Sequence, residues 1–315
     1  MREFKILAVV VFFTLVTYWG VEPFAHSQMH KHVEGHHFKY DGTADIEEAT
    51  TEKKAVKEAF WTEVKSISVM KGNAANGEAV YANCMGCHNG AGVNMGGVIP
   101  PNLDHAGAIY DKDYLIALIK DPAMASNVDH KYADTSTHPM GSIKFMVSDP
   151  QQIADVVAYL MEKKAGEVTP KEAYEEACGR CHAMRYAKWT QIGETPMFKE
   201  EKDALAHKIK VLDEQAAVKA YMGKLPPDLS MIIRARGEHF LETFVENPQA
   251  QLPGTSMPRV GLTEEGYEKV EHYLTEIGDP SKEARAALGP WVIGFFFIFT
   301  ILAYLWKKAM WRGHH

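Results

Sequence analysis

The sequence predicts a mainly α-helical protein with two similar small domains in tandem and an apolar segment at each end of the chain. Three observations lead to this prediction. The motif Cys-x-x-Cys-His occurs twice, the residues after each copy follow the same order of landmarks, and an uncharged run near each terminus lies next to basic residues. At 315 residues the chain also has the length of about two domains.

The two motifs are Cys84-Met-Gly-Cys87-His88 and Cys178-Gly-Arg-Cys181-His182, and together they use all four cysteines. Cys-x-x-Cys-His is the signature for covalent attachment of a c-type haem. The two thiols add to the vinyl groups of one porphyrin, and the next histidine lies under the iron. The sequence therefore predicts two covalently bound c-type haems, with His88 and His182 as proximal iron ligands. Zinc knuckles or redox dithiols are the alternative uses of these cysteines.

The chain begins with an apolar run from Ile6 to Val21 that follows two basic residues. This pattern is typical of a signal peptide, and Ala25-His26-Ser27 offers small residues for cleavage. The same run is at the short edge of what crosses a bilayer. Residues 1–25 are therefore either a signal peptide or a retained anchor.

Residues 26–69 have the composition of a polar linker. The start of this segment is rich in histidine, a common metal ligand, but no carboxylate or cysteine completes a ligand set there. We expect a solvated segment next to the membrane, then a surface helix or linker from Ala44 to Lys65. The histidines are His26, His30, His32, His36 and His37.

Residues 70–165 form the first predicted domain, which runs through helix, haem motif, Pro-Pro turn, helix, methionine loop and last helix. The landmarks are Asn76 as the first helix cap, Cys84–His88, Pro100–Leu103, a helix from Asp113 to Ile119, Met140, and a capping box at Ser148–Gln151.

Residues 166–280 form the second predicted domain and repeat this order. The landmarks are a capping box at Thr169–Glu172, Cys178–His182, Pro226–Leu229, a helix within Gly237–Pro248, Met257, and a last helix capped by Thr263. An internal repeat of this kind aligns the two domains without a second sequence. Equivalent positions are therefore expected to have the same role.

The repeat also selects the second axial ligand of each iron. Electron-transfer cytochromes commonly place a methionine sulfur opposite the histidine, which raises the reduction potential. Met140 and Met257, out of fifteen methionines, both lie in the loop before the last helix of their domain. For the first haem, Met146 and His138 are alternatives to Met140.

The domains differ between the haem motif and the Pro-Pro turn. From Ala183 to Lys224 the second domain has a charged, amphipathic insertion, whereas the corresponding stretch of the first domain is much shorter. The insertion is either a solvated excursion or a docking surface beside one haem edge.

Residues 286–306 carry no charge and reach the roughly 20 residues that cross a bilayer. Trp291, Tyr304 and Trp306 lie near the edges of this segment, where interfacial aromatics are enriched, and residues 307–315 form a basic tail. The positive-inside rule places the tail in the cytoplasm. The haem domains are then on the periplasmic side of a bacterial inner membrane.

The second domain and tail resemble cytochrome c1 of the cytochrome bc1 complex, the quinol–cytochrome c reductase. The matching features are the haem motif, the insertion, Pro226-Pro-Asp-Leu-Ser230, Ile233-Arg234-Ala-Arg236-Gly237, Pro253-Gly-Thr-Ser-Met257-Pro258 and the C-terminal anchor. The first domain resembles class I cytochromes c. The whole chain is similar to the di-haem bacterial variant of cytochrome c1, which implies two tandem class I cytochrome c domains with a C-terminal transmembrane helix.

The resemblance implies a function and partners. Cytochrome b and the Rieske iron–sulfur protein would be fellow subunits, and electrons would pass from the Rieske protein through the haems to a cytochrome c acceptor. The resemblance supports Met257 as an axial ligand and implies that Arg236 contacts a haem propionate. Phe240 stands where the family usually has tyrosine, which removes one propionate hydrogen bond. By family position, the Cys178 haem takes the electron before the Cys84 haem.

Two other functions remain open. A di-haem subunit of a haem-copper oxidase typically has an N-terminal anchor only, and a di-haem peroxidase needs one iron without a second axial ligand. No catalytic acid, base or nucleophile stands out, as expected for an electron-transfer subunit whose cofactor does the chemistry. The net charge of −7 argues against nucleic acid as a partner.

Overall fold

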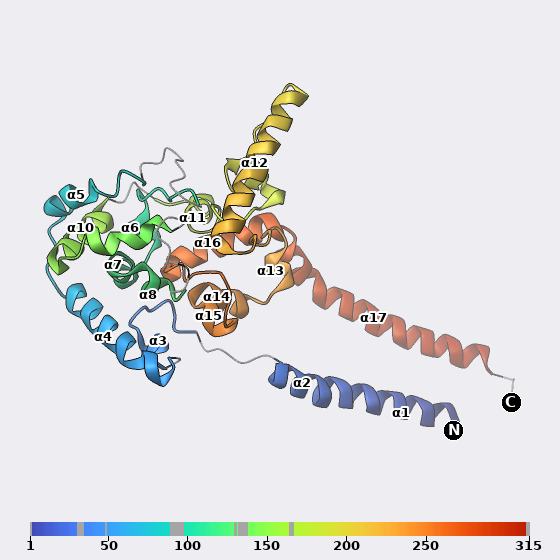
Figure 1. Cartoon of the computed structure of the whole chain (residues 1–315). Coiled ribbons are helices and arrows are strands. Elements are labelled where there is room, and N and C mark those ends of the chain that lie inside the picture. The colour runs from blue at the N-terminus through green and yellow to red at the C-terminus, as the bar shows by residue number, and fades with distance from the viewer. Residues whose placement is uncertain are drawn as a thin grey trace.

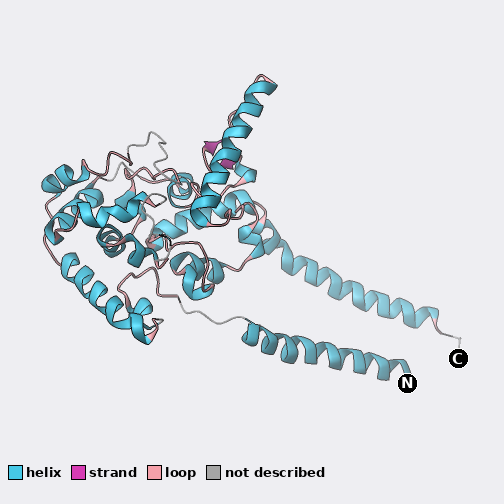
Figure 2. Ribbon diagram, viewed as in Figure 1, coloured by secondary structure: helices cyan, strands magenta, loops and turns pink. Residues whose placement is uncertain are grey.

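The computed structural model describes residues 2–29, 35–47, 49–88, 98–128, 131, 138–163 and 167–312. Most of these residues are helical, and a short antiparallel strand pair is the one sheet among them (Figure 2). Two long helices project from the same side of a helical body and carry the termini at their far ends (Figure 1). Helix α12 (Glu201–Met222) projects from the body in a different direction (Figure 1).

The first half of the body, within residues 70–165, consists of short helices. They are α5 (Ala74–Tyr81), α6 (Ala106–Ile109), α7 (Lys112–Lys120), α8 (Pro122–Ser126), a 3-10 turn (Pro139–Ser142), α9 (Ile143–Met146) and α10 (Pro150–Glu162). The helix expected from Asp113 to Ile119 is confirmed as α7.

Two helix caps in this half differ from those expected. Asn73, not Asn76, caps α5, and its side chain accepts two backbone N–H groups. Asp149, not Ser148, caps α10, because Pro150 takes the first helical position, where its missing N–H is harmless. Both helices are where the sequence predicts them, but their first residues are set by a different polar side chain.

Helices α5 and α10 cross in close contact. A Cβ atom on Gly77 would lie 2.0 Å from the carbonyl oxygen of Asp155, so only glycine lets the two backbones come this near. Beside the crossing, the rings of Tyr81 and Tyr159 pack with centroids 5.1 Å apart. The crossing holds the chain leading into Cys84 against the last helix of this half.

The second half, within residues 166–280, has a similar series of helices. They are α11 (Pro170–Ala177), a 3-10 turn (Arg185–Ala187), strands β1 (Trp189–Thr190) and β2 (Gly193–Glu194), α12 (Glu201–Met222), α13 (Ile232–Ala235), α14 (Glu238–Glu246), α15 (Pro248–Gln251) and α16 (Glu264–Gly278).

Helices α11 and α16 pack as α5 and α10 do. The rings of Tyr174 and Tyr273 lie 5.2 Å apart, which matches the Tyr81–Tyr159 pair of the first half. The capping box predicted at Thr169 and Glu172 is confirmed, and Thr263 caps α16 as expected. The sequence repeat is therefore also a repeat of helix packing.

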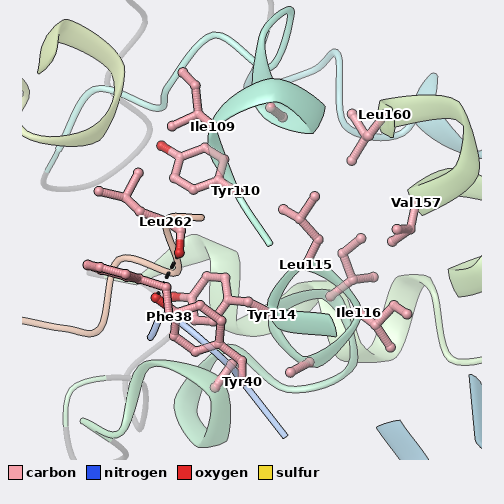
Figure 3. Close-up of a cluster of buried hydrophobic side chains, with 14 of the residues drawn as sticks. Phe38, Tyr40, Ile109, Tyr110, Tyr114, Leu115, Ile116, Val157, Leu160 and Leu262 are labelled. Atoms are coloured by element: carbon pink, nitrogen blue, oxygen red, sulfur yellow. Dashed lines mark hydrogen bonds between the residues drawn. The ribbon is translucent and has the colours of Figure 1, made fainter. Parts of the chain in front are cut away.

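The two halves share one hydrophobic core rather than two separate ones. Figure 3 shows Phe38 and Tyr40 beside Tyr114 of α7, with Leu262 of the second half next to them. The Tyr40 hydroxyl donates to the carbonyl oxygen of Leu262 over 3.0 Å. The backbone N–H of Thr263 donates to the carbonyl oxygen of Ile109 over 2.9 Å, which joins the halves directly.

The segment expected to be a linker or surface helix is built into the body. It contains α3 (Thr43–Glu47) and α4 (Thr51–Ser68), and the apolar face of α4 is buried at Phe60, Trp61, Val64 and Ile67. Upstream, the Glu246 carboxylate accepts the backbone N–H groups of His36 and Phe38 at 2.8 and 2.7 Å. His30 and His32 lie outside the described residues.

Each end of the chain forms a helix long and apolar enough to cross a membrane: Arg2–Ala25 and Lys282–Met310. The first comprises α1 (Arg2–Val16), a π turn (Thr17–Val21) and α2 (Glu22–Met29), and the second is α17 (Lys282–Met310). The most apolar stretch of each is entirely unburied. Lys307 Nζ lies 3.3 Å from Glu3 Oε2, so the outer ends of the two helices are in contact.

Candidate functional site

Both Cys-x-x-Cys-His motifs fold into the same turn at the end of a helix. In the first, the backbone N–H groups of Cys87 and His88 donate to the carbonyl oxygen of Cys84 at 3.1 and 2.8 Å. In the second, Cys181 and His182 donate to Cys178 at 3.1 and 2.9 Å. Because the chain coils through each motif, both thiols and the imidazole lie along one short turn.

The two imidazoles are held by equivalent carbonyl groups. His88 Nδ1 lies 2.8 Å from the carbonyl oxygen of Pro101, and His182 Nδ1 lies 2.8 Å from that of Pro227. A carbonyl oxygen only accepts, so Nδ1 carries the hydrogen in both residues and Nε2 keeps its lone pair. This is how a protein orients an imidazole that binds a metal.

The surroundings of both histidines favour the neutral ring. Burial lowers the pKa of His182, although the Pro227 carbonyl and Asp228 act in the opposite direction. Burial also lowers the pKa of His88, and the positive charge of Arg180 adds to this effect. A neutral imidazole is the form that ligates iron.

The four cysteines are free thiols, with no disulfide among them. Burial raises the pKa of Cys178 to about 12, so this thiol stays protonated. Within the described ranges, no three His, Cys, Asp or Glu side chains gather into a group that would hold a metal ion. A zinc knuckle needs four such ligands around one point, and the described side chains do not provide them.

Both motifs open into one cavity of about 1000 Å³. This volume is at the upper end of the roughly 300–1,000 Å³ that ligand pockets occupy. Residues of both halves form its wall, and they include Cys84, Cys87, His88, Pro101, Met140, Cys178, Cys181, His182, Pro227 and Met257. All eight residues predicted to attach haem or ligate iron therefore line the same space.

Comparison with known proteins agrees with this geometry. Residues 74–164 match the model of the family described as Cytochrome c. A cytochrome c2 from Rhodopseudomonas palustris is 33% identical over 116 residues, which covers 99% of that protein and 29% of this chain. This chain belongs to the cytochrome c family. The ammonia monooxygenase gamma subunit of Nitrosomonas europaea is 27% identical over 190 residues, 81% of its length and 46% of this chain. No solved structure matches the chain.

Membership of the cytochrome c family implies a covalently bound c-type haem in the matched segment, residues 74–164. The residues present fit such a group. Cys84 and Cys87 border the cavity as free thiols, His88 offers an unprotonated Nε2, and the wall between them is largely apolar. A porphyrin needs this combination of thiols, imidazole and apolar surface.

The structure discriminates among the candidates for the second axial ligand of the first haem. Met140 lines the cavity and is half-buried, whereas Met146 borders it with 57% of its surface exposed. His138 is buried, but it is not part of the cavity wall, and its ring packs at a tilt against that of Tyr221 with centroids 4.0 Å apart. This geometry favours Met140, and Met257 has the equivalent place in the second half.

Arg236, which the resemblance assigned to a haem propionate, lies away from the cavity. Its side chain is exposed, and its guanidinium stacks on the ring of Phe240 at 5.1 Å. Its role therefore remains a prediction, without support from the geometry. The cavity wall instead contains Arg259, which is only 5% exposed. Sequence reasoning missed this residue, although a charge directly after Met257-Pro258 was a possible signal.

Arg180, inside the second motif, reaches the first half. Its Nη1 donates to the carbonyl oxygen of Ile99 at 3.4 Å, directly before the Pro-Pro turn that holds His88. Its Nε donates to the carbonyl oxygen of Glu176 at 3.3 Å. The second motif thus lies against the loop that orients His88, and the two Cys-x-x-Cys-His motifs are neighbours.

The insertion contains a helix that is exposed over most of its length and buried at its C-terminal end. Most of α12 is exposed, as shown by Leu205 at 59%, but Val218 and Met222 in its last turns are buried. Tyr221, Met222 and Leu225 line the cavity, and Lys131 of the first half donates to the carbonyl oxygen of Met222 over 2.6 Å. The insertion therefore closes part of the cavity.

Proposed function

We propose that this cytochrome c is a membrane-anchored di-haem subunit of a quinol–cytochrome c reductase, and that it passes single electrons from a Rieske iron–sulfur protein to a cytochrome c acceptor. The observation that carries the two-haem proposal is the repeated hydrogen bond of a motif histidine to a proline carbonyl, His88 to Pro101 and His182 to Pro227. A second motif without a haem would have no need of the same orientation.

The second half is proposed to be a second cytochrome c domain. It pairs its first and last helices around two tyrosines, as the matched first half does. It also supplies Cys178, Cys181, His182 and Met257 to the same cavity. The two haems would then lie close together in one apolar space, which suits direct electron transfer between them.

The chain's own residues prepare both sites for electron transfer rather than for substrate chemistry. A bound haem supplies the one-electron redox couple. The proline carbonyls fix the imidazole rings, and Met140 and Met257 would fill the opposite axial positions with soft sulfur ligands that raise the reduction potential. With both axial positions filled by side chains, no position is left for a substrate.

The anchoring helices support a membrane-bound complex. Two terminal helices are apolar enough to cross a membrane, and basic residues lie at the outer end of each, Arg2 and Lys5 in one and Lys307 and Lys308 in the other. By the positive-inside rule both outer ends would face the cytoplasm and the haem body the periplasm. The Nitrosomonas europaea relative is also named as a subunit of a larger enzyme.

The resemblance of residues 226–258 to cytochrome c1 supports the reductase over other complexes. It is a resemblance of motifs in the order that the family has them, ending in a C-terminal anchor. Within such a complex, the Cys178 haem would be reduced first and the Cys84 haem second. The contact of Arg180 with the carbonyl of Ile99 provides the required proximity.

Purification of the full-length protein from native membranes tests the proposal. We expect two haems per chain by pyridine haemochrome assay, co-purification with a haem-b cytochrome and a Rieske protein, and inhibitor-sensitive quinol oxidation. One haem per chain would refute the di-haem site. Isolation with a copper-containing oxidase would assign the chain to that complex instead, and carbon monoxide binding to the reduced native protein would favour a peroxidase.

A further inference from the structure

Arg259 is a buried cation at the wall of the haem cavity. It lies two residues after Met257, and only 5% of its surface is exposed. Its Nη1 and Nη2 donate to the two carboxylate oxygens of Asp45 at 2.9 and 2.5 Å. Trp61 Nε1 donates to Asp45 Oδ2 as well, over 3.0 Å. The carboxylate is thus fixed by the N-terminal segment, and it fixes one edge of the guanidinium.

Of the three guanidinium nitrogens, Nε is the one that the Asp45 carboxylate does not contact. Arg259 Nε is buried and has no hydrogen-bond partner among the described residues. Leaving a buried N–H of a charged group unpaired costs free energy, and proteins rarely do so. An acceptor that does not belong to the described chain is therefore expected next to Nε.

Two spaces border Arg259, and they admit different acceptors. One is a void of about 10 Å³ lined also by His36 and Asp45, which has room for at most a water molecule. The other is the large cavity that both haem motifs share. A haem placed there brings propionate carboxylates into a largely apolar space, where an anion needs a cation or N–H donors to compensate for lost hydration.

We propose that Arg259, held in place by Asp45, donates its Nε hydrogen to a propionate of a haem in this cavity. The residue then positions the haem at the segment that carries Met257. This proposal relies on the presence of haem in the cavity, which the proposed function shares, but it does not depend on a second haem or on the identity of the complex.

The proposal predicts the direction in which two substitutions shift the reduction potential of the haem. Oxidation adds a positive charge at the iron, so a nearby cation disfavours the ferric state and a nearby anion favours it. Replacing Arg259 with glutamine leaves both Asp45 and the propionate uncompensated and should lower the reduction potential. Replacing Asp45 with asparagine leaves the cation unbalanced and should raise it.

The test uses Arg259→Gln, Asp45→Asn and Arg259→Lys in the full-length protein, purified in detergent with its haem content measured. Spectroelectrochemical titration should show a roughly tenfold change in the reduction equilibrium of one haem, about 59 mV for a one-electron couple, downward in Arg259→Gln and upward in Asp45→Asn. Arg259→Lys should stay close to the unmodified protein, because it keeps the charge. Arg236→Gln tests the alternative that follows from the family resemblance, in which Arg236 rather than Arg259 contacts the propionate.

Each of Arg259→Gln and Asp45→Asn leaves one charge of the ion pair unbalanced, so a pair beside a haem predicts opposite shifts even where Nε binds only water. Opposite shifts therefore show that the pair lies next to a haem, and shifts of equal sign, or none, contradict this. Either result overturns the proposal, as does a shift in Arg236→Gln without one in Arg259→Gln. Resonance Raman of Arg259→Lys distinguishes a propionate contact from a water-bound Nε, whether or not the charge-changing variants accumulate. The propionate bending band should then move relative to the unmodified protein, and an unchanged band overturns the proposal. The haem count and quinol oxidation test the function separately.

Discussion

His182 donates its Nδ1 hydrogen to the carbonyl oxygen of Pro227 over 2.8 Å, and this bond decides which nitrogen faces the haem cavity. Since Nδ1 is engaged, Nε2 holds the free lone pair. His88 and Pro101 have the same relationship in the matched cytochrome c segment. The two Pro-Pro turns of the sequence are therefore part of the candidate site, because each turn supplies the acceptor that orients a motif histidine.

Replacing Met257 with leucine should remove one iron ligand while keeping most of the side-chain volume. We expect the near-infrared thioether-to-iron band to lose the contribution of one haem. The potential of that haem should fall by on the order of 0.1 V, within the roughly 0.8 V range that axial ligation spans. Met140→Leu should do the same for the other haem. Near-infrared spectroscopy and redox titration of the reduced and oxidised protein measure both effects.

Met146→Leu is the matched control for these variants, because Met146 borders the cavity but is 57% exposed. The near-infrared band and the reduction potentials of Met146→Leu should equal those of the unmodified protein. A loss of the band in Met146→Leu but not in Met140→Leu would reassign the ligand. In the assembled complex, Met257→Leu should also block reduction of both haems by quinol, and fast reduction of the Cys84 haem would disprove the proposed electron order.

The sequence was sufficient to bring the predicted site residues together. The eight residues predicted to attach haem or ligate iron border one cavity, because the repeat has each motif, Pro-Pro turn and methionine loop at equivalent points. Thr169 and Thr263 cap their helices as expected, since capping depends on adjacent residues.

The parts that sequence reasoning missed depend on contacts between distant segments. Asp45 and Arg259 form an ion pair although they are 214 positions apart in the sequence, and nothing local marks either residue as buried. The same holds for Phe38 and Tyr40, which lie in a segment of polar composition but pack into the shared core. Arg236 was assigned from a motif match, and it is exposed at the junction of α13 and α14, a position that the motif does not specify.

Acid should destabilise the protein through Asp45. Burial alone would raise the pKa of this carboxyl, but the Arg259 guanidinium holds it below its ordinary value. A depressed pKa contributes stability above the unfolded value of about 3.9, and that stability is lost as the pH falls through the folded pKa. We expect the free energy of unfolding to decrease below about pH 4, measured by denaturant titration at several pH values.

The Asp45→Asn variant distinguishes the contribution of Asp45 to this pH dependence of stability from that of other carboxyl groups. At pH 7 it should be less stable by about 3–5 kcal/mol, because a buried cation loses its partner. Below about pH 4 the difference from the unmodified protein should shrink, since protonation removes the same charge. A constant difference across the whole pH range would show that Asp45 does not titrate with unfolding.

Gly77→Ala should force α5 and α10 apart, because the new methyl group would lie 2.0 Å from the Asp155 carbonyl oxygen. Overpacking of this kind costs about 1–3 kcal/mol. Gly289→Ala in α17 is the control, since no atom lies within 4 Å of the added Cβ. Its effect should range from none to a stabilisation of about 1 kcal/mol, because alanine is the better helix former. Equal stability of the two variants in chemical unfolding would show that the crossing tolerates a side chain.

The N-terminal helix should be retained in the mature protein. The candidate cleavage site, Ala25-His26-Ser27, lies inside α2, and proteases prefer exposed, irregular segments. The contact of Glu3 with Lys307 also joins this helix to α17. Intact-mass measurement of protein from native membranes should give a chain that starts at Met1 or Arg2. A mature N-terminus near Ser27 would identify the segment as a cleaved signal peptide.

Tyr221→Ala should weaken the closure of the cavity by α12. The Tyr221 ring packs at a tilt against the ring of His138 at 4.0 Å, two residues before Met140, and it lines the cavity itself. Loss of such a ring pair removes about 1 kcal/mol, enough to raise the population with a displaced Met140 loop about fivefold. Carbon monoxide binding to the reduced protein should increase, because the iron is then open for part of the time. Leu205→Ala, on the exposed part of the same helix, should bind no more carbon monoxide than the unmodified protein; equal binding by both variants would mean that α12 does not control access to the first haem.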